Sequence, residues 1–306
     1  MAPLSDNMRG AVYMMVCMAA FVINDALMKS VSGGLTVFQA MFLRGIAATT
    51  LVGLLAAYKG ALLHRPAPGD GRLLVTRLVG EIGGTICFLT ALFHMPIANA
   101  TAILQSMPLA VTLGAALFLR EPVGWRRYLA IAIGFSGVLV IVRPGAEGFN
   151  TYALFAVTAV AFMVLRDLST RRLSRSVPSL FVAFTTAAAI TLTGGAVSAF
   201  QPWPEVPMTT VGTLAVAAGF LFVGYLFNVM TMRSGEIGFV APFRYTILIW
   251  AILLGVVVFG EIPDSQMLAG SAIVVGTGVY TFYREQRLRI AERRGAKALA
   301  PGGRLV

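Results

Sequence analysis

Long apolar stretches, separated by short segments of Gly, Pro and charged residues, follow one another from residue 10 to residue 283. A bilayer core about 30 Å thick requires about 20 apolar residues per helix, and most of these stretches have that length. Membrane-spanning strands would instead show alternating segments of about ten residues. The pattern predicts an all-α membrane protein with ten spans, two inverted sets of five, at 10–30, 35–58, 73–93, 97–119, 125–142, 149–166, 178–200, 209–231, 237–259 and 265–283.

The composition agrees with this pattern. Hydrophobic residues make up 58% of the chain, charged residues 12%, and the mean hydropathy is +0.81. A soluble domain is about half apolar and about a quarter charged, so this chain has too few polar residues to cover a soluble surface. Cys17 and Cys87 lie apart inside apolar runs, so we expect small core residues and neither a disulfide nor a metal site.

The first apolar run resembles a signal peptide, because Arg9 precedes it. The run continues through Asn24 and Asp25 to Lys29, and further spans follow it. We therefore expect a retained first helix.

The distribution of basic residues predicts the orientation. If the N-terminus is cytoplasmic, 20 of the 24 Lys and Arg residues lie on that side, only Lys29 and Arg143 lie on the other, and Arg44 and Arg244 fall within spans. The positive-inside rule then places both termini in the cytoplasm, in a bacterial inner membrane. The net charge of +11 is explained by topology and by a basic tail, 285–306, that lies on anionic lipid headgroups, so no nucleic-acid partner is implied.

Two segments of the chain, 97–121 and 237–261, resemble each other. Each begins with Ile and ends with Glu, and a proline and then a glycine-bearing apolar stretch follow each Glu. Because an odd number of spans per half turns the second half upside down, we expect inverted repeats over 1–145 and 146–284. Transporters of this architecture bind substrate near the membrane midplane, between the halves.

The ten-span layout and the endings Leu119-Arg120-Glu121 and Phe259-Gly260-Glu261 resemble the EamA-type carriers of the drug/metabolite transporter superfamily, over residues 10–283. The resemblance implies secondary transport of a small molecule. The segments 21–29 (FVINDALMK) and 242–245 (PFRY) are similar to the branch that includes bacterial riboflavin and S-adenosylmethionine uptake carriers. Because the superfamily includes importers and exporters, the resemblance leaves the direction of transport open.

Ionisable residues within the predicted spans are few, and each is expected to be paired or to face water. Asp25 and Lys29 are four residues apart on one helix, which suggests either a structural ion pair near the outer end or a part of the substrate site. Glu81 is expected to pair with an arginine. The alternative is that Glu81 takes up a proton and couples transport to the proton gradient.

Two arginines lie deep in predicted spans. Arg44 is either a packing residue that bonds carbonyls at the end of another helix or a part of the site. Arg244 follows Pro242, which interrupts the backbone hydrogen bonding of a helix. A guanidinium at such a position can bind a carboxylate, a phosphate or a ring carbonyl, so Arg244 is the foremost candidate for substrate binding.

Amides and aromatic residues complete the predicted site. Gln105 aligns with Tyr245 through the repeat, so the two are expected to face each other across the pseudo-twofold axis. Phe88, together with Phe93, Phe243 and Trp250, is available to stack on a flat ligand. The predicted substrate-binding residues are Asn24, Asp25, Lys29, Arg44, Glu81, Phe88, Gln105, Tyr225, Asn228, Arg244 and Tyr245.

Motifs of other protein classes are missing from the sequence. The two histidines, His64 and His94, stand apart and no H-E-x-x-H or G-x-S-x-G occurs, which argues against an intramembrane enzyme. No P-loop is present, and ten spans in two halves favour a carrier over a channel. We therefore expect a monomeric or homodimeric transporter without cofactor or metal, carrying a polar, partly aromatic metabolite. Candidates are riboflavin or S-adenosylmethionine, and the alternative is export of amino acids or drugs.

Overall fold

The computed structural model describes residues 5–62, 64, 66–67, 69–121, 124–145, 150–174, 176–233 and 236–299. Within these ranges the chain is helical and contains no strand, so the all-α prediction is confirmed for them. The helices are α1 (Asp6–Ser30), α2 (Val37–Tyr58), α3 (Asp70–His94), α4 (Ile97–Leu104), α5 (Met107–Phe118), α6 (Trp125–Val142), α7 (Tyr152–Arg172), α8 (Ser179–Ser198), α9 (Met208–Arg233), α10 (Ile237–Val240), the 3-10 helix η1 (Ala241–Tyr245), α11 (Thr246–Phe259) and α12 (Ser265–Leu299).

In the described part of the chain, nine helical stretches are long and apolar enough to cross a membrane. Among them, α4 and α5 form one stretch, as do η1 and α11. The tenth predicted span, 265–283, is helical as part of α12 but is not among the nine. Its first turns carry Ser265 and Gln266, and glycines and hydroxyl side chains follow, which lowers its hydropathy.

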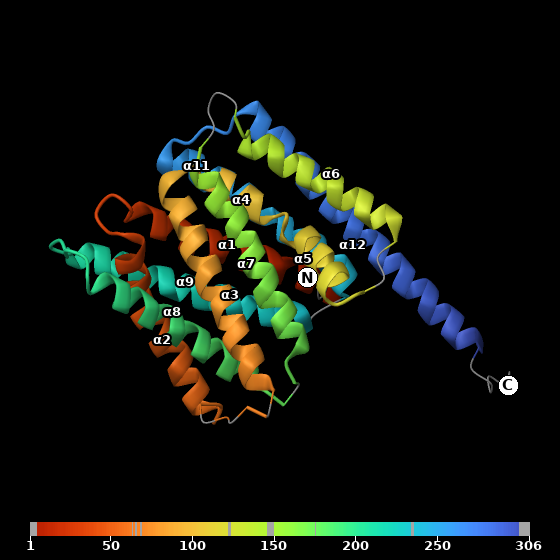
Figure 1. The fold of residues 1–306 in the computed structure, drawn as a ribbon, viewed down its shortest axis with the longest axis horizontal. Helices are drawn as coiled ribbons and strands as arrows, with labels where there is room; N and C mark the ends of the chain where they lie inside the picture. Colours follow the sequence, from red (N-terminus) through yellow and green to blue (C-terminus); the bar gives the residue numbers. More distant parts are fainter. Residues whose placement is uncertain are drawn as a thin grey trace.

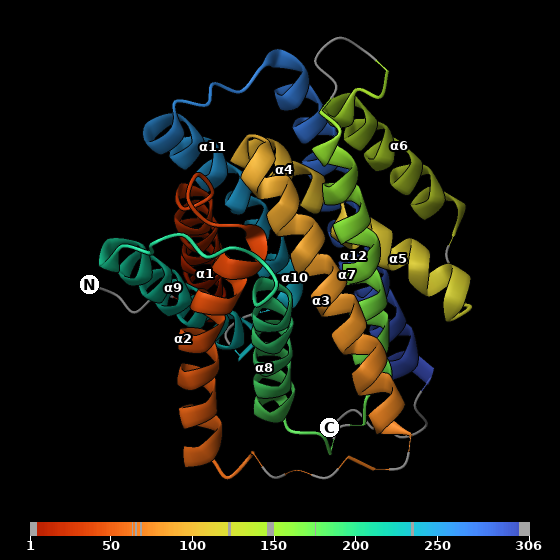
Figure 2. The same cartoon turned by 60° about the vertical axis from the view of Figure 1, so that its left-hand side comes forward.

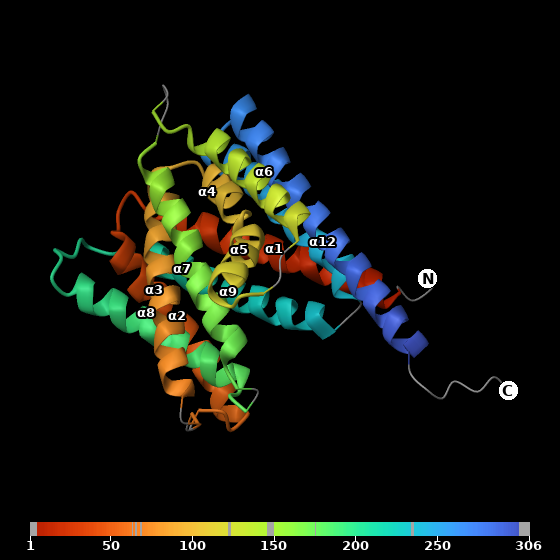
Figure 3. The ribbon, with the colours of Figure 1, turned by 45° about the vertical axis from the view of Figure 1, so that its right-hand side comes forward.

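Four pairs of helices, each joining the first half of the chain to the second, pack along one another: α1 with α9, α2 with α8, α3 with α7 and α6 with α12. Figures 1 and 3 show the last pair along one edge of the bundle. Glycines lie at these contacts. A Cβ at Gly80 would lie 2.7 Å from the Phe162 carbonyl of α7, and a Cβ at Gly137 would lie 2.8 Å from the Gly270 carbonyl of α12. Small residues let membrane helices approach closely, as expected for these positions.

The ends of α5 and α11 have the same local geometry. Arg120 and Gly260 adopt left-handed backbone conformations, with φ of 55° and 66°. The N–H of Glu121 then donates to the Ala115 carbonyl at 3.3 Å, and the N–H of Glu261 donates to the Gly255 carbonyl at 2.9 Å. The sequence likeness of the two endings therefore extends to the backbone hydrogen bonds that terminate each helix.

Both of these membrane stretches are interrupted at corresponding positions. The predicted continuous span 97–119 is in fact divided, because α4 ends before Gln105 and α5 begins at Met107, with Pro108 unable to donate a backbone hydrogen bond. In the second half the 3-10 helix η1, which contains Pro242, separates α10 from α11. The expected interruption at Pro242 is present, whereas its counterpart near Gln105 was not predicted.

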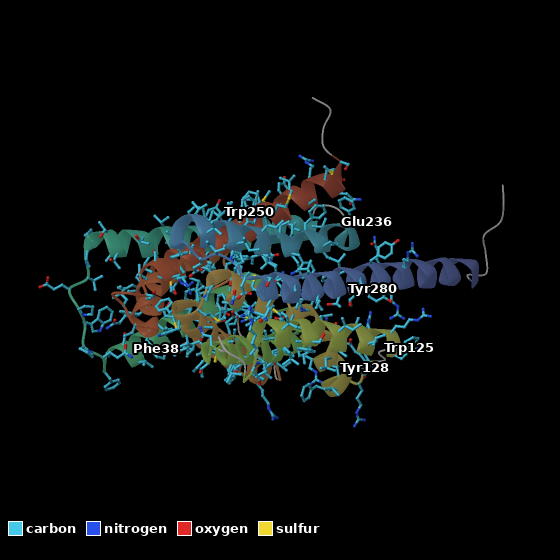
Figure 4. The ribbon with its side chains drawn as sticks, turned by 90° about the horizontal axis from the view of Figure 1, so that it is seen from above. Phe38, Trp125, Tyr128, Glu236, Trp250 and Tyr280 are labelled. Atoms are coloured by element: carbon cyan, nitrogen blue, oxygen red, sulfur yellow. The ribbon has the colours of Figure 1, made fainter. Side chains whose placement is uncertain are left out.

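The two ends of the bundle are distinct. Figure 4 places Trp125, Tyr128 and Glu236 at the end towards which the start of α1 and the last turns of α12 point, and Phe38 at the opposite end. Figure 2 shows the last turns of α6 and α11 at one end, and the last turns of α2 at the other. The position of a charged side chain inside the bundle can therefore be described by its distance from each of these two ends.

Candidate functional site

One group of polar side chains joins α1 to α2 inside the bundle. Arg44 Nη1 donates to Asn24 Oδ1 at 3.3 Å, and Asn24 Nδ2 donates to Asp25 Oδ1 at 2.9 Å. Asn24 is 2% exposed and Arg44 7%, and the Arg44 Nε donor has no partner among the described residues. Arg44 therefore bonds a side-chain amide rather than helix-end carbonyls, and it retains a free donor in a buried position.

A second group joins α3, α7 and α8. Arg77 Nη2 and Arg166 Nη1 each lie 3.3 Å from a different oxygen of Glu81. Arg166 Nε also lies 2.8 Å from Asp167 Oδ1, and Arg77 donates to the hydroxyls of Thr170 and Thr186. The expected pairing of Glu81 with an arginine is present, and Glu81 is shared by two.

Tyr225 of α9 connects these two groups. Its hydroxyl lies in the electrostatic field of Glu81 and Arg166 and of two further arginines, Arg44 and Arg77. The residue is 49% exposed, and its ring meets Phe21 edge to face with centroids 5.6 Å apart. Charged side chains inside a membrane face protein or water, and Tyr225 brings a phenol hydroxyl close to both groups.

Lys29 does not pair with Asp25, so that prediction was wrong. Lys29 Nζ lies 2.8 Å from Glu261 Oε1, at the loop between α11 and α12. It also donates to the Leu92 carbonyl at 3.3 Å and to the Met95 carbonyl, at the end of α3. The long side chain reaches carbonyls at a helix end and a distant carboxylate, whereas Asp25 is engaged by Asn24 one residue away.

The other oxygen of Glu261 satisfies the start of α4. The Ile97 N–H donates to Glu261 Oε2 at 2.9 Å, and the side chains of Lys29 and Glu261 are 11% and 20% exposed. A carboxylate at a helix N-terminus is stabilised by the free N–H groups and by the helix dipole. Lys29 and Glu261 therefore fasten α1, α3, α4 and α11 together at one end of the bundle.

Arg244 is partly buried in η1 and makes no hydrogen bond or ion pair with another described residue. Its charge acts on Cys17 of α1 and on Tyr245. Asn228 of α9 is also partly buried and has no bonded side-chain partner within the described ranges. Both residues therefore keep their hydrogen-bonding capacity for a ligand or water.

The repeat-related residues Gln105 and Tyr245 do not behave as expected. The Tyr245 ring lies against Gly278 of α12, where a Cβ would overlap its hydroxyl, and it meets Phe282 edge to face at 6.4 Å. Tyr245 thus faces α12 and not the centre between the halves, so the idea that it faces Gln105 was wrong. Gln105 is 7% exposed, and its Nε2 has no partner among the described residues.

The predicted stacking residues are mostly packing residues. Phe88 is 9% exposed and belongs to the main apolar core, against which Phe93 also packs. Phe243 and Trp250 pack on a second cluster around Met14, Cys17 and Val240. Because neighbouring side chains cover the Phe88 ring, its placement favours a packing role over the predicted contact with a flat ligand.

Sequence reasoning missed Arg77 and Arg166 as members of the site. Both were assigned to the basic side of the membrane, but they lie inside helices, with side chains only 13% and 21% exposed. The spacing of Arg77 and Glu81, four residues apart on one helix, is a signal that would have identified the first of them. Arg166 is brought to Glu81 only by the packing of α7 on α3.

No three His, Cys, Asp or Glu side chains among the described residues lie close enough together to hold a metal ion. The polar groups described above are arginines, carboxylates, amides and a phenol. Such groups bind charged or hydrogen-bonding organic molecules.

Comparison with known proteins identifies the family. The EamA-like transporter family model matches residues 8–143 and matches again at 150–283. The chain belongs to the EamA-like transporter family. It is a multi-pass membrane protein of the drug/metabolite transporter superfamily, and its apolar helices are the transmembrane elements of that fold.

Characterised relatives differ in what they carry. The chain is 26% identical over 194 residues to the S-adenosylmethionine uptake transporter of Rickettsia conorii, covering 63% of this chain and 65% of that protein. It is 30% identical over 185 residues to the riboflavin transporter of Vibrio cholerae, covering 60% and 61%. It is 27% identical over 267 residues to the pseudopaline exporter CntI of Pseudomonas aeruginosa, covering 83% and 89%. The matches to both uptake proteins thus span less than two thirds of the relatives' length.

One crystal structure of another protein superposes with a TM-score of 0.60 at 20% sequence identity, covering 90% of this chain and 98% of that one. This likeness concerns the fold alone.

Proposed function

We propose that this EamA-family member is a secondary transporter that carries a small polar, partly aromatic metabolite across the inner membrane by alternating access. Riboflavin and S-adenosylmethionine are the foremost candidates. The observation that carries the proposal is that two partly buried polar groups, Asn24 with Asp25 and Arg44, and Glu81 with its arginines, both lie near the Tyr225 hydroxyl inside the bundle. A bilayer-spanning protein maintains such groups at high energetic cost, and a substrate site explains that cost.

The chemistry of the site suits a ligand with several hydrogen-bond acceptors and both signs of charge. Arg44 Nε and Gln105 Nε2 are buried donors without a partner among the described residues. Arg244 and Asn228 supply further groups that are not engaged. The Asp25 carboxylate lies near Arg44, and Glu81 lies between Arg77 and Arg166, so a zwitterion or a polar heterocycle would meet complementary groups.

The helix pairing supports two repeats, 1–145 and 146–284, of opposite orientation. If each helix is exchanged for its counterpart in the other half, α1 becomes α7 and α9 becomes α3. The pair of α1 and α9 then becomes the pair of α7 and α3. The pair of α2 and α8 is unchanged by the exchange, as is the pair of α6 and α12, and the contact of α5 with α7 becomes the contact of α11 with α1. A packing that is preserved under this exchange is expected for a pseudo-twofold axis in the membrane plane.

The two ends of the bundle are fastened unequally, which supports alternating access. Glu261 binds Lys29 and the Ile97 N–H in a partly buried place, at 2.8 and 2.9 Å. Its repeat counterpart Glu121 lies 3.5 Å from Arg171, and both side chains are about half exposed. We interpret this conformation as closed at the Lys29 end. Rocking the two halves about the midplane would release the contacts of Glu261 at this end and bury the pair of Glu121 and Arg171 at the other.

The orientation is part of the proposal, with both termini in the cytoplasm and the Lys29 end facing the periplasm. The 20 basic residues assigned to the inner side support it. Lys29 and Arg143, on the outer side, are both neutralised by the loop between α11 and α12, through Glu261 and Asp264. A reporter enzyme fused after Val306 should be active only if that enzyme works in the cytoplasm; activity of a periplasm-specific reporter would reverse the orientation.

Transport by purified full-length protein in liposomes is the decisive test. Labelled riboflavin, S-adenosylmethionine, amino acids and simple amines are offered with and without a proton gradient, and protein-free liposomes give the background. Glu81→Gln should lower transport of the correct substrate, whereas Glu205→Gln, the same change at an exposed position between α8 and α9, should leave it near the wild-type rate. Transport of simple aliphatic amines alone, without flavin or S-adenosylmethionine binding, would contradict the proposed substrate class.

Export is the second candidate function, with amino acids or drugs as cargo. It is supported by the 27% identity to the Pseudomonas exporter over 83% of this chain. The S-adenosylmethionine uptake transporter of Rickettsia prowazekii matches 93% of this chain at 22% identity, so the extent of the match does not separate the two directions. Efflux from preloaded liposomes, compared with uptake under the same gradient, distinguishes the two directions.

A further inference from the structure

A deep groove of about 880 Å³ lies between α3, α5 and α7, with Phe135 of α6 at its inner side. Although α3 and α7 also carry Arg77, Glu81 and Arg166, these three charged side chains are not among the residues that line the groove, and neither is Tyr225. Figure 2 shows α5 diverging from α3 and α7 at this place. The groove therefore requires an explanation other than the substrate site.

The walls of the groove are apolar and face outwards. They include Leu117 and Phe118 of α5, which are 63% and 72% exposed, and Leu165 of α7, which is 37% exposed. In a membrane these exposed apolar side chains face hydrocarbon. A gap of this size between helices must be filled by something apolar, because water in the bilayer core finds few partners there.

One end of the groove is basic. Arg72, in the first turn of α3, and Arg172, the last residue of α7, both line it and are both exposed. Neither guanidinium makes a hydrogen bond or ion pair with another residue in the described part of the chain. Two free arginines at the end of an apolar groove form a complementary site for a phosphate attached to an apolar tail.

The length of the groove matches a single leaflet. Along α7 its lining runs from Ala161 to Arg172, which at 1.5 Å per residue is roughly 16 Å. The hydrocarbon core is about 30 Å thick, so the groove extends from the membrane surface to about the midplane. A molecule that fits is therefore as long as one acyl chain with its headgroup.

We propose that this groove is a binding site for an anionic phospholipid. The phosphate lies between Arg72 and Arg172, and one acyl chain lies along Leu165 and Ala161 towards Phe135. The lipid comes from the leaflet on the basic side of the protein, where anionic headgroups attract Lys and Arg. By filling the space between α5 and the pair of α3 and α7, it holds α5 at its present distance.

Lipid titration by native mass spectrometry of the full-length protein tests the proposal, with phosphatidylglycerol and phosphatidylcholine of identical acyl chains. The wild type should bind phosphatidylglycerol more tightly. The double variant Arg72→Gln/Arg172→Gln should bind it roughly thirtyfold more weakly, from about 1 kcal/mol per basic residue, and should lose the preference. Arg9→Gln/Lys59→Gln removes the same charge at two exposed positions away from the groove and should retain the preference for phosphatidylglycerol.

Two further measurements test the apolar part and guard against misfolding. Ala161→Phe fills the groove and should weaken the binding of both lipids. Arg72→Lys/Arg172→Lys keeps the charge and should retain the preference for phosphatidylglycerol. Glycerol 3-phosphate, which has no acyl chain, should not displace the lipid. The proposal is overturned by equal binding of the two lipids to the wild type, by displacement with glycerol 3-phosphate, or by equal losses of phosphatidylglycerol binding in Arg72→Gln/Arg172→Gln and in the Arg9→Gln/Lys59→Gln control.

Discussion

Lys29, in the last turn of α1, and Glu261, just beyond α11, form an ion pair with 2.8 Å between Nζ and Oε1. The same carboxylate accepts the Ile97 N–H, and the same ammonium donates to two carbonyls at the end of α3. Four helices meet in this one pair of side chains. Its role can be separated experimentally from that of an ordinary surface ion pair, which contributes little.

We expect Lys29→Gln and Glu261→Gln to open this end of the bundle. Glu261→Gln keeps an oxygen for the Ile97 N–H but removes the charge that holds Lys29. In a variant with Cys17 and Cys87 replaced by Ser, a cysteine at Ala98, which is 4% exposed, should react about tenfold faster with an impermeant maleimide. Lys29→Arg keeps the charge and donors for the Leu92 and Met95 carbonyls and should retain slow labelling. Unchanged labelling in Lys29→Gln and Glu261→Gln would mean that the pair does not hold the end closed.

Two glycines of α12 provide a matched test of the contact with η1. A Cβ at Gly278 would overlap the Tyr245 hydroxyl, whereas a Cβ at Gly276 meets nothing within 4 Å. Gly278→Ala should lower the free energy of unfolding by about 1–3 kcal/mol through overpacking, seen as a lower melting temperature in detergent. Gly276→Ala should be neutral or slightly stabilising. Equal melting temperatures for the two variants would contradict this placement of Tyr245.

Arg244 is expected to bind substrate rather than to support the fold, because it has no partner among the described residues. Arg244→Lys keeps the charge but loses the planar pair of donors, so substrate binding should weaken at normal membrane levels. Expression and melting temperature are measured beside transport. Normal transport by Arg244→Ala at normal expression would refute the functional role, and loss of folded protein in both variants would favour a structural one.

Asn24 is expected to be essential for holding Arg44. Asn24→Ala removes the acceptor of Arg44 Nη1 and leaves a guanidinium that is 7% exposed with no acceptor on α1. The cost should be about 2–3 kcal/mol, because an unsatisfied buried donor loses its hydration without compensation. Thermal unfolding in detergent measures it. Ser30→Ala, which removes an exposed hydroxyl of the same helix, serves as the control and should change stability little.

Stability should also depend on pH through Asp264, in the loop between α11 and α12. The backbone N–H of Met267 and the nearby Arg143 lower the pKa of this carboxyl below its ordinary value of 3.8. A group with a lowered folded pKa stabilises the fold above its unfolded pKa, and the contribution is lost as the pH falls through the folded pKa. The melting temperature of Asp264→Ala should therefore lie below that of the wild type at neutral pH.

Acidification to below the folded pKa of Asp264 should abolish this difference, since the wild-type carboxyl is then protonated. Asp264→Asn keeps an acceptor for the Met267 N–H, so its melting temperature at neutral pH should lie between those of the wild type and Asp264→Ala. A difference between wild type and Asp264→Ala that persists unchanged into strong acid would show that the charge of Asp264 does not stabilise the loop.

The sequence alone determined the helical class, the apolar spans and the likeness of the segments that end at Glu121 and Glu261. These properties depend on hydropathy and on spacing along the chain. A segment that crosses a bilayer must be apolar and must satisfy its own backbone hydrogen bonds, so its sequence pattern is strongly constrained. It also identified Arg44 and Glu81 as ionisable residues that need a partner or water inside the membrane. The structure gives both of them side-chain partners from other helices.

Only the tertiary structure decided which side chains meet. Lys29 and Asp25 share a helix face, yet the flexible Lys29 side chain pairs with Glu261 instead. Helix packing brings that carboxylate and two carbonyls at the end of α3 within its range. Arg166 reaches Glu81, and Tyr245 turns towards Gly278, for the same reason. Contacts between residues far apart in the chain depend on the rotation and register of packed helices, and periodicity along a single chain does not specify these.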